Sequence, residues 1–148
     1  MVAEIPGDVG FDNKPSIDAK ALRINLNQFI YGTFAEIGAG QEVARHFFRV
    51  GGASGTIAKS VSAYDKNFSD TIYGEEDDKR YVTETRLTKM LNHEMDLLED
   101  RIPKKDHPNK LFFTLANTVT TIDFAKNIWG MVGWVFAFKQ NQMSLIVK

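Results

Sequence analysis

The segment GGASGT at residues 51–56 has the residue types of an anion cradle. Flexible glycine amides can converge on a phosphate, two hydroxyls add donors, and a lysine follows about one helical turn later. The order GxxxxGK[ST] of a P-loop is not present. A tight turn between two helices is the alternative explanation. The phosphate-binding hypothesis rests on Gly51, Gly52, Ser54, Gly55, Thr56 and Lys59.

Glu42 and His46 form a second group with possible chemistry. They are one helical turn apart, so a helix would place them on one face. Histidine has the ordinary pKa that suits general acid–base catalysis near neutral pH. The alternative is a surface pair between Glu42 and Arg45, with His46 at the edge of the core beside Phe47 and Phe48.

Several other kinds of site are not favoured by the residues present. His93, Glu94 and Asp96 lack the i, i+4 pair of a helical metal site. The chain has no cysteine, which excludes disulfides and thiolate chemistry. Its formal net charge of −1, without long basic runs, argues against nucleic acid as a partner. Trp129 and Trp134 could line a ligand or pigment pocket, with ordinary core packing as the alternative.

The elements that position these residues can be inferred from periodicity. Apolar residues at helical spacing predict a helix over 41–50 and another, capped by Ser54 or Thr56, running to Tyr64. A long helix is predicted from the N-cap Thr83 to Ile102, where Pro103 ends the pattern. We interpret Gly38, Gly40, Gly51, Gly52 and Gly55 as setting how closely two helices approach.

Four short segments predict strands. LRINLN at 22–27 alternates apolar and polar residues, LFFTLA at 111–116 reads as a buried strand, and 133–139 and 143–148 could form a hairpin. The charged run 74–80 predicts a solvated loop. The expected fold is α+β, with three or four helices packed on a small sheet of about four strands.

Length and composition predict one folded unit. The chain has 148 residues, of which 43% are hydrophobic and 25% charged. Residues 1–20 hold prolines and glycines without periodicity, which predicts an extended N-terminal arm before a single globular domain over 21–148. The longest apolar stretch, about eleven residues, is too short to span a bilayer.

Two parts of the chain resemble known families. The block over 24–74, which contains FAEIGAGQEVARHFFRVGGASGTIAKS, resembles the N-terminal region of an uncharacterised bacterial and algal family. Its members often carry labels such as TonB-dependent receptor or nicotinamide-nucleotide adenylyltransferase, for which no barrel and no nucleotidyltransferase phosphate motif is visible here. The segment IPGDVGFD at 5–12 is similar to the N-terminal segment of plastid chlorophyll-binding antenna proteins, although the membrane helix that follows in antenna proteins is missing.

The second resemblance implies a non-enzymatic accessory or linker subunit docked on a photosystem–antenna assembly, at the stromal face of the plastid thylakoid. Antenna or photosystem subunits would be the partners, and a peripheral chlorophyll or carotenoid contact would be possible. The alternatives are a small soluble enzyme or a phosphate-binding domain that uses 51–59, and a homo-oligomer paired through exposed aromatics. The expected partner-binding residues are Ile5, Pro6, Val9, Phe11, Trp129 and Trp134.

Overall fold

The computed structural model describes residues 14–120, 133–140 and 143–147, and their side chains up to residue 120. Its centre is a five-stranded sheet with the order β2-β1-β3-β4-β5. The first three strands are mutually parallel, and β4 and β5 extend the sheet as antiparallel strands. The strands are β1 (Ile30–Gly38), β2 (Ile57–Ala63), β3 (Leu111–Thr120), β4 (Gly133–Gln140) and β5 (Met143–Val147).

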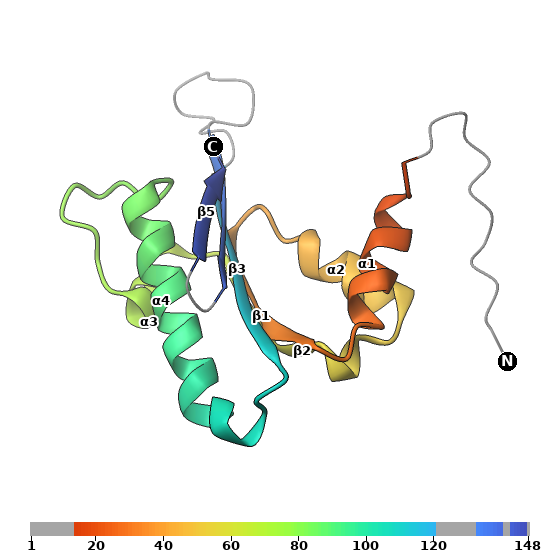
Figure 1. The fold of residues 1–148 in the computed structure, drawn as a ribbon. Helices are drawn as coiled ribbons and strands as arrows, with labels where there is room; N and C mark the ends of the chain where they lie inside the picture. Colours follow the sequence, from red (N-terminus) through yellow and green to blue (C-terminus); the bar gives the residue numbers. More distant parts are fainter. Residues whose placement is uncertain (1–13, 121–132, 141–142, 148) are drawn as a thin grey trace, which may run out of the picture.

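Helices cover both faces of the sheet, with α1 and α2 on one side and α3 and α4 on the other (Figure 1). The predicted α+β class is confirmed, with four α-helices among the described residues and one strand more than expected. The helices are α1 (Ile17–Asn25), α2 (Val43–Val50), α3 (Lys66–Tyr73) and α4 (Glu84–Arg101).

Each face of the sheet has its own hydrophobic core. Alternate residues of β1 divide between the two, because successive side chains of a strand point to opposite faces. Phe34 packs with Ala44 and Phe113 beneath α2, whereas Ala35 packs with residues of α4 such as Met90. All five side chains are buried.

Several predicted elements are confirmed. The long helix begins after Thr83, whose hydroxyl accepts a hydrogen bond from the Arg86 amide at 3.1 Å, and it ends two residues before Pro103. The helix over 41–50 corresponds to α2, the segment at 111–116 lies in β3, and β4 and β5 form the expected hairpin.

The strand predicted at 22–27 is wrong, because this segment lies in α1. The Ser16 hydroxyl caps the helix by accepting a hydrogen bond from the Ala19 amide at 3.1 Å. The helix buries Ala21 and Asn25, one turn apart, and leaves Leu26 69% exposed. The apolar alternation therefore did not mark a buried strand face.

Helix α1 also begins within the range 1–20 assigned to the arm, and residues 1–13 lie outside the described residues.

The helix predicted from Ser54 or Thr56 to Tyr64 is also wrong, because β2 occupies this stretch. Its residues pair with β1 from Ile57 to Ala63. Ile57 and Val61 are β-branched and fit a strand as well as a helix stripe, so periodicity over so short a run did not separate the two.

Candidate functional site

A crevice of about 310 Å³ lies where the three parallel strands end, and we call it the strand-end crevice. Gly38 from β1, Tyr64 just after β2 and Thr118 from β3 contribute to its lining. Lys66 and Lys79 come from α3 and from the loop before α4. In open sheets with parallel strands, ligands bind outside the carboxyl ends of the strands.

Two lysines give the strand-end crevice a positive character. The Lys66 ammonium lies 4.5 Å from the centre of the Tyr81 ring, and among the described side chains it has no ion-pair partner. Lys79 donates to Glu75 at 2.6 Å, which raises the pKa of Lys79. Among the described residues, no Asp or Glu belongs to the lining of this crevice. The lining can therefore attract an anion.

The backbone at Lys79 has a left-handed conformation, with φ of 56°. This conformation is uncommon for a residue with a side chain and costs about 1–2 kcal/mol. The amide of Lys79 donates to the carbonyl of Glu76 at 3.0 Å, which holds the turn in place. Strained residues of this kind cluster at binding sites, so the position of Lys79 in the crevice wall supports a functional interpretation.

Tyr81 is fixed by hydrogen bonds on both sides. Its hydroxyl donates to the Asp70 carboxylate at 2.7 Å, and its carbonyl accepts from the Thr118 hydroxyl at 3.0 Å. Burial and the Asp70 carboxylate raise the pKa of the Tyr81 phenol. Tyr81 therefore stays protonated near neutral pH, and its ring offers a fixed surface beside Lys66.

Arg86 of α4 fixes α3 and the following loop, which form one wall of the strand-end crevice. Its guanidinium is fully buried and donates to the Ser69 hydroxyl at 2.7 Å and to the carbonyl of Gly74. It also pairs with Asp70 at 3.3 Å and with Glu76 at 3.2 Å. One side chain thus connects α3, the loop that follows it and α4.

The predicted phosphate cradle does not assemble as one site. The glycines and Ser54 form a turn at the amino end of β2, next to α1 and α2. The Thr56 hydroxyl is buried and donates to the carbonyl of Asn25 at 2.8 Å, so it faces away from solvent. The helix amino terminus that the hypothesis required is replaced by β2. Lys59 lies on the opposite face of the sheet, against Glu94 of α4.

Glu42 and His46 make separate contacts. Glu42 is exposed and lies 3.9 Å from Arg45, as the surface-pair alternative proposed. The His46 ring lies 3.3 Å from Asp18 and 3.1 Å from Arg49, at the contact between α1 and α2. The carboxylate buried at the start of α2 is instead Glu36, which accepts from the amides of Val43 and Ala44.

The contact of Asp18 with Arg49 gives a pH-dependent prediction. The hydrogen bond from Arg49, at 2.6 Å, and then the contact with His46 lower the pKa of Asp18 below its ordinary 3.8. This carboxylate therefore stabilises the fold above about pH 4, and the contribution is lost as the pH falls through the lowered pKa. We expect Asp18→Asn to lower the urea midpoint slightly at pH 7, and the difference from wild type to disappear near pH 2.

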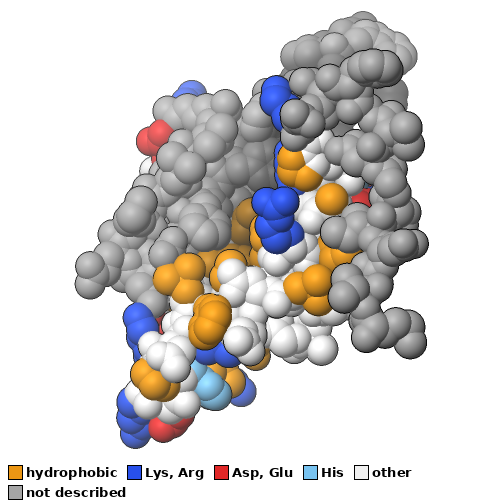
Figure 2. Space-filling view, turned by 45° about the vertical axis from the view of Figure 1, so that its right-hand side comes forward, with side chains coloured by type: hydrophobic (Ala, Val, Ile, Leu, Met, Phe, Trp, Pro, Cys, Tyr) orange, Lys and Arg blue, Asp and Glu red, His pale blue; other side chains and the backbone are white. Residues whose placement is uncertain are grey.

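The predicted partner-binding residues cannot be placed in a surface. Ile5, Pro6, Val9, Phe11 and Trp129 lie outside the described residues, and of Trp134 only the backbone, in β4, is described. Exposed hydrophobic side chains elsewhere are interspersed with charged and other side chains in the described part of the face in Figure 2. Pairing of subunits through aromatics stays a prediction. The large exposed hydrophobics are Ile17, Leu26, Phe29, Phe48, Tyr64 and Phe68.

The crevice residues were missed because two of the three strands that end there were missed. Neither β1 nor β2 was predicted, and Lys79 was assigned to a solvated charged loop. A usable signal was the segment from Ile30 to Ile37, which is rich in β-branched and aromatic residues and is followed by Gly38. Recognising that strand would have drawn attention to the residues that follow the strand ends.

No protein-family model matches the chain, and no curated protein matches it. Solved bacterial structures share its fold. A competence-damaged protein (CinA) superfamily protein from Enterobacter cloacae matches with a TM-score of 0.63 at 15% identity, over 97% of this chain and 83% of that one. A competence/damage inducible protein from Agrobacterium tumefaciens matches with 0.63 at 16%, over 90% and 80%. One from Enterobacter asburiae matches with 0.64 at 12%, over 90% and 82%.

These neighbours correct the function inferred from resemblance. They are bacterial proteins described as competence-damaged or competence/damage-inducible, not antenna proteins or TonB-dependent receptors, so the photosystem linker and its thylakoid location are wrong. Eight residues at 5–12 were too short a basis for that inference. Among the described residues, no helix is both long and apolar enough to cross a membrane.

Proposed function

We propose that this chain binds a small anionic molecule, carrying a phosphate or carboxylate group, in the strand-end crevice. The observation that carries the proposal is the pair Lys66 and Lys79 in a crevice whose described lining residues include no carboxylate. Lys66 supplies a positive charge without an ion-pair partner among the described side chains. This retains the anion-binding alternative of the sequence but moves it from the glycine turn to the strand ends.

Position and size support this choice. The crevice lies at the carboxyl ends of parallel strands, where open sheets of this kind bind ligands. Its volume of about 310 Å³ is at the lower end of the range for small-molecule sites. The solved neighbours share the fold at 12–16% identity, which supports the architecture and leaves the ligand to be determined by experiment.

The proposal is binding rather than a named reaction. The lining offers hydroxyls from Tyr64, Ser69 and Thr118, but its described residues include no histidine or carboxylate that could activate one of them as a nucleophile. Ser69 already accepts a hydrogen bond from Arg86, and Thr118 already donates to Tyr81. These groups are suited to orienting a ligand.

Titration calorimetry against inorganic phosphate, adenosine monophosphate and succinate tests the proposal and separates phosphate from carboxylate ligands. We expect at least one probe to bind, and Lys66→Gln and Lys79→Gln each to weaken its binding by about tenfold, since a hydrogen bond to a charged group contributes about 1.5–3 kcal/mol. Lys104→Gln is the matched control, because Lys104 is exposed and belongs to a separate short helix. Binding that Lys66→Gln and Lys104→Gln affect equally would contradict the proposal, as would absence of binding by all three probes.

A further inference from the structure

We infer a second ligand site, separate from the strand-end crevice, that takes a small organic acid with an apolar body. It is a pocket of about 340 Å³ between the amino ends of β1 and β2 and the last turn of α4. Lys59 and Arg101 are its two cationic residues, and we call it the Lys59–Arg101 pocket. This inference does not depend on the proposed function, because the two cavities share no lining residue.

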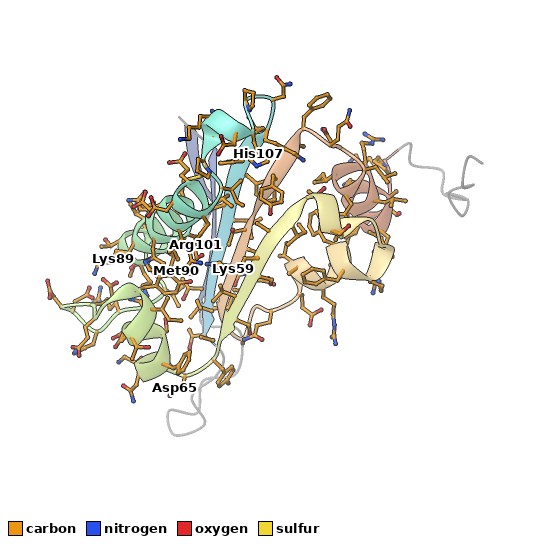
Figure 3. All side chains as sticks on the ribbon, turned by 90° about the horizontal axis from the view of Figure 1, so that it is seen from below. Lys59, Asp65, Lys89, Met90, Arg101 and His107 are labelled. Atoms are coloured by element: carbon orange, nitrogen blue, oxygen red, sulfur yellow. The ribbon has the colours of Figure 1, made fainter. Side chains whose placement is uncertain are left out.

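A β-bulge in β2 directs the Lys59 side chain into this pocket. The pairing of β1 with β2 goes from Gly32 opposite Ile57 to Thr33 opposite Lys59, so Ala58 is an extra residue. Ala58 and Lys59 therefore both line the pocket on the α4 face, whereas ordinary alternation would put them on opposite faces. Bulges are common next to functional sites, where they redirect a side chain. Figure 3 shows Lys59 extending from β2 toward α4, where Arg101 lies.

Buried groups behind the pocket hold the Lys59 ammonium in place. Lys59 forms an ion pair with Glu94, whose side chain is only 1% exposed. The other oxygen of this carboxylate accepts a hydrogen bond from the Tyr73 hydroxyl at 2.7 Å. Burial and the Glu94 charge raise the pKa of Tyr73, so the phenol remains a donor. Burying a carboxylate costs free energy, and here the buried Glu94 carboxylate fixes the Lys59 ammonium at the edge of the pocket.

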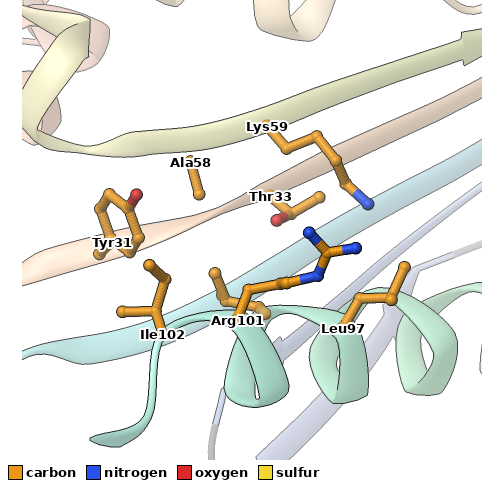
Figure 4. A pocket seen from close by; sticks show the side chains of 8 residues that line it. Tyr31, Thr33, Ala58, Lys59, Leu97, Arg101 and Ile102 are labelled. Carbon is orange, nitrogen blue, oxygen red and sulfur yellow. The ribbon is translucent and has the colours of Figure 1, made fainter.

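Arg101 brings a positive charge that no described carboxylate neutralises. It is the last residue of α4, where a cation is favoured by the helix dipole. Among the described side chains it has no ion-pair partner, and no Asp or Glu lines the pocket. Its guanidinium lies near the Lys59 ammonium, and both point into the same space (Figure 4). Since Glu94 balances Lys59, the described residues leave this pocket with a net positive charge, which suits an anion.

The rest of the lining defines the body of the ligand. Leu97, Leu98 and Ile102 provide an apolar wall, and Tyr31 and Thr33 add hydroxyl-bearing side chains (Figure 4). Planar guanidinium groups bind carboxylates and phosphates through bidentate hydrogen bonds. The chemistry shared by the candidate ligands is an anionic head on a short aliphatic or aromatic body, which a cavity of about 340 Å³ can hold.

Nuclear magnetic resonance titration of the full chain with hexanoate and with phenyl phosphate tests this inference and separates carboxylate from phosphate heads. We expect a saturable shift of the Thr33, Lys59 and Arg101 amides, with a Kd on the order of millimolar for probes of this size. Arg101→Gln should weaken binding by about tenfold. Arg80→Gln, which removes an exposed arginine elsewhere, should leave it unchanged.

Lys59 needs a paired substitution, because removing it alone would leave Glu94 as an uncompensated buried charge. We expect the double variant Lys59→Gln/Glu94→Gln to fold and to lose about tenfold in affinity for the same probe. Lys66→Gln should have no effect here, which separates this site from the strand-end crevice. The inference is overturned if neither probe produces saturable shifts at these amides, or if Arg101→Gln and Arg80→Gln bind with the same Kd.

Discussion

Replacing Arg86 with methionine is expected to lower the free energy of unfolding by about 3–5 kcal/mol, since it breaks a buried ion-pair network: Asp70 loses its ion-pair partner among the described side chains, and Glu76 keeps only Lys89. Arg86 is fully buried and pairs with Glu76, whose side chain is 5% exposed. It also holds Asp70 and the Ser69 hydroxyl. Much of a typical domain's stability of about 5–15 kcal/mol would be lost. Chemical unfolding followed by circular dichroism measures the change.

Two further variants separate the buried charge from simple loss of volume. Arg80→Met removes an exposed arginine and should change the free energy of unfolding by less than about 0.5 kcal/mol. Adding Asp70→Asn to Arg86→Met removes the carboxylate that Arg86→Met leaves without an ion-pair partner among the described side chains, so this double variant should be more stable than Arg86→Met alone. If Arg86→Met unfolds at the same denaturant concentration as wild type, the brace between α3 and α4 is not important for stability.

Replacing Gly38 with alanine is expected to have the second largest effect, a loss of more than about 2 kcal/mol. Gly38 has φ of +78°, and an added Cβ would lie 2.1 Å from the carbonyl oxygen of Val119. That oxygen also accepts a hydrogen bond from the Ala39 amide at 3.1 Å, so it belongs to the pairing of β1 with β3 and cannot move freely. The alanine would combine a disfavoured backbone conformation with a clash against another strand. Thermal unfolding measures the shift in Tm.

The other glycines provide graded controls for Gly38. Gly52 has φ of +71° but would place a Cβ 3.5 Å from Leu26, an ordinary contact, so Gly52→Ala should cost about 1–2 kcal/mol from the backbone alone. Gly55 has open space around it and no positive φ, so Gly55→Ala should be nearly neutral. If the three variants lose equal stability, the contact with Val119 is not the cause of the Gly38 effect.

These glycines also show where the sequence interpretation needs correction. We interpreted five of them as spacers between two helices. Gly38 and Gly40 instead lie against Val119 of β3, and an added Cβ on Gly51 or Gly55 would meet nothing within 4 Å. A glycine indicates that the backbone needs a positive φ or a close approach to another group, but it does not indicate which element it approaches.

Long or strongly bounded elements were predictable from the sequence because their signals are local. Thr83 and Pro103 bracket α4, and a bulky apolar run defines β3. Helix α1 and strands β1 and β2 were not predicted. The short segment at 22–27 fitted a strand pattern, while its helical state depends on the Ser16 cap and on Asn25, which donates to the carbonyls of Phe47 and Gly51. Contacts between residues more than twenty positions apart are invisible to periodicity.

By itself the sequence determined the α+β class, the ends of α4 and the residue types able to bind an anion, because propensity, capping and side-chain chemistry are properties of neighbouring residues. The tertiary structure alone decided which of those residues meet. It brought Lys66 and Lys79 to the ends of three strands, moved Lys59 to α4 through one extra residue at Ala58, and separated His46 from Glu42. Strand order and register determine which of these residues come into contact, and both arise from packing between distant segments.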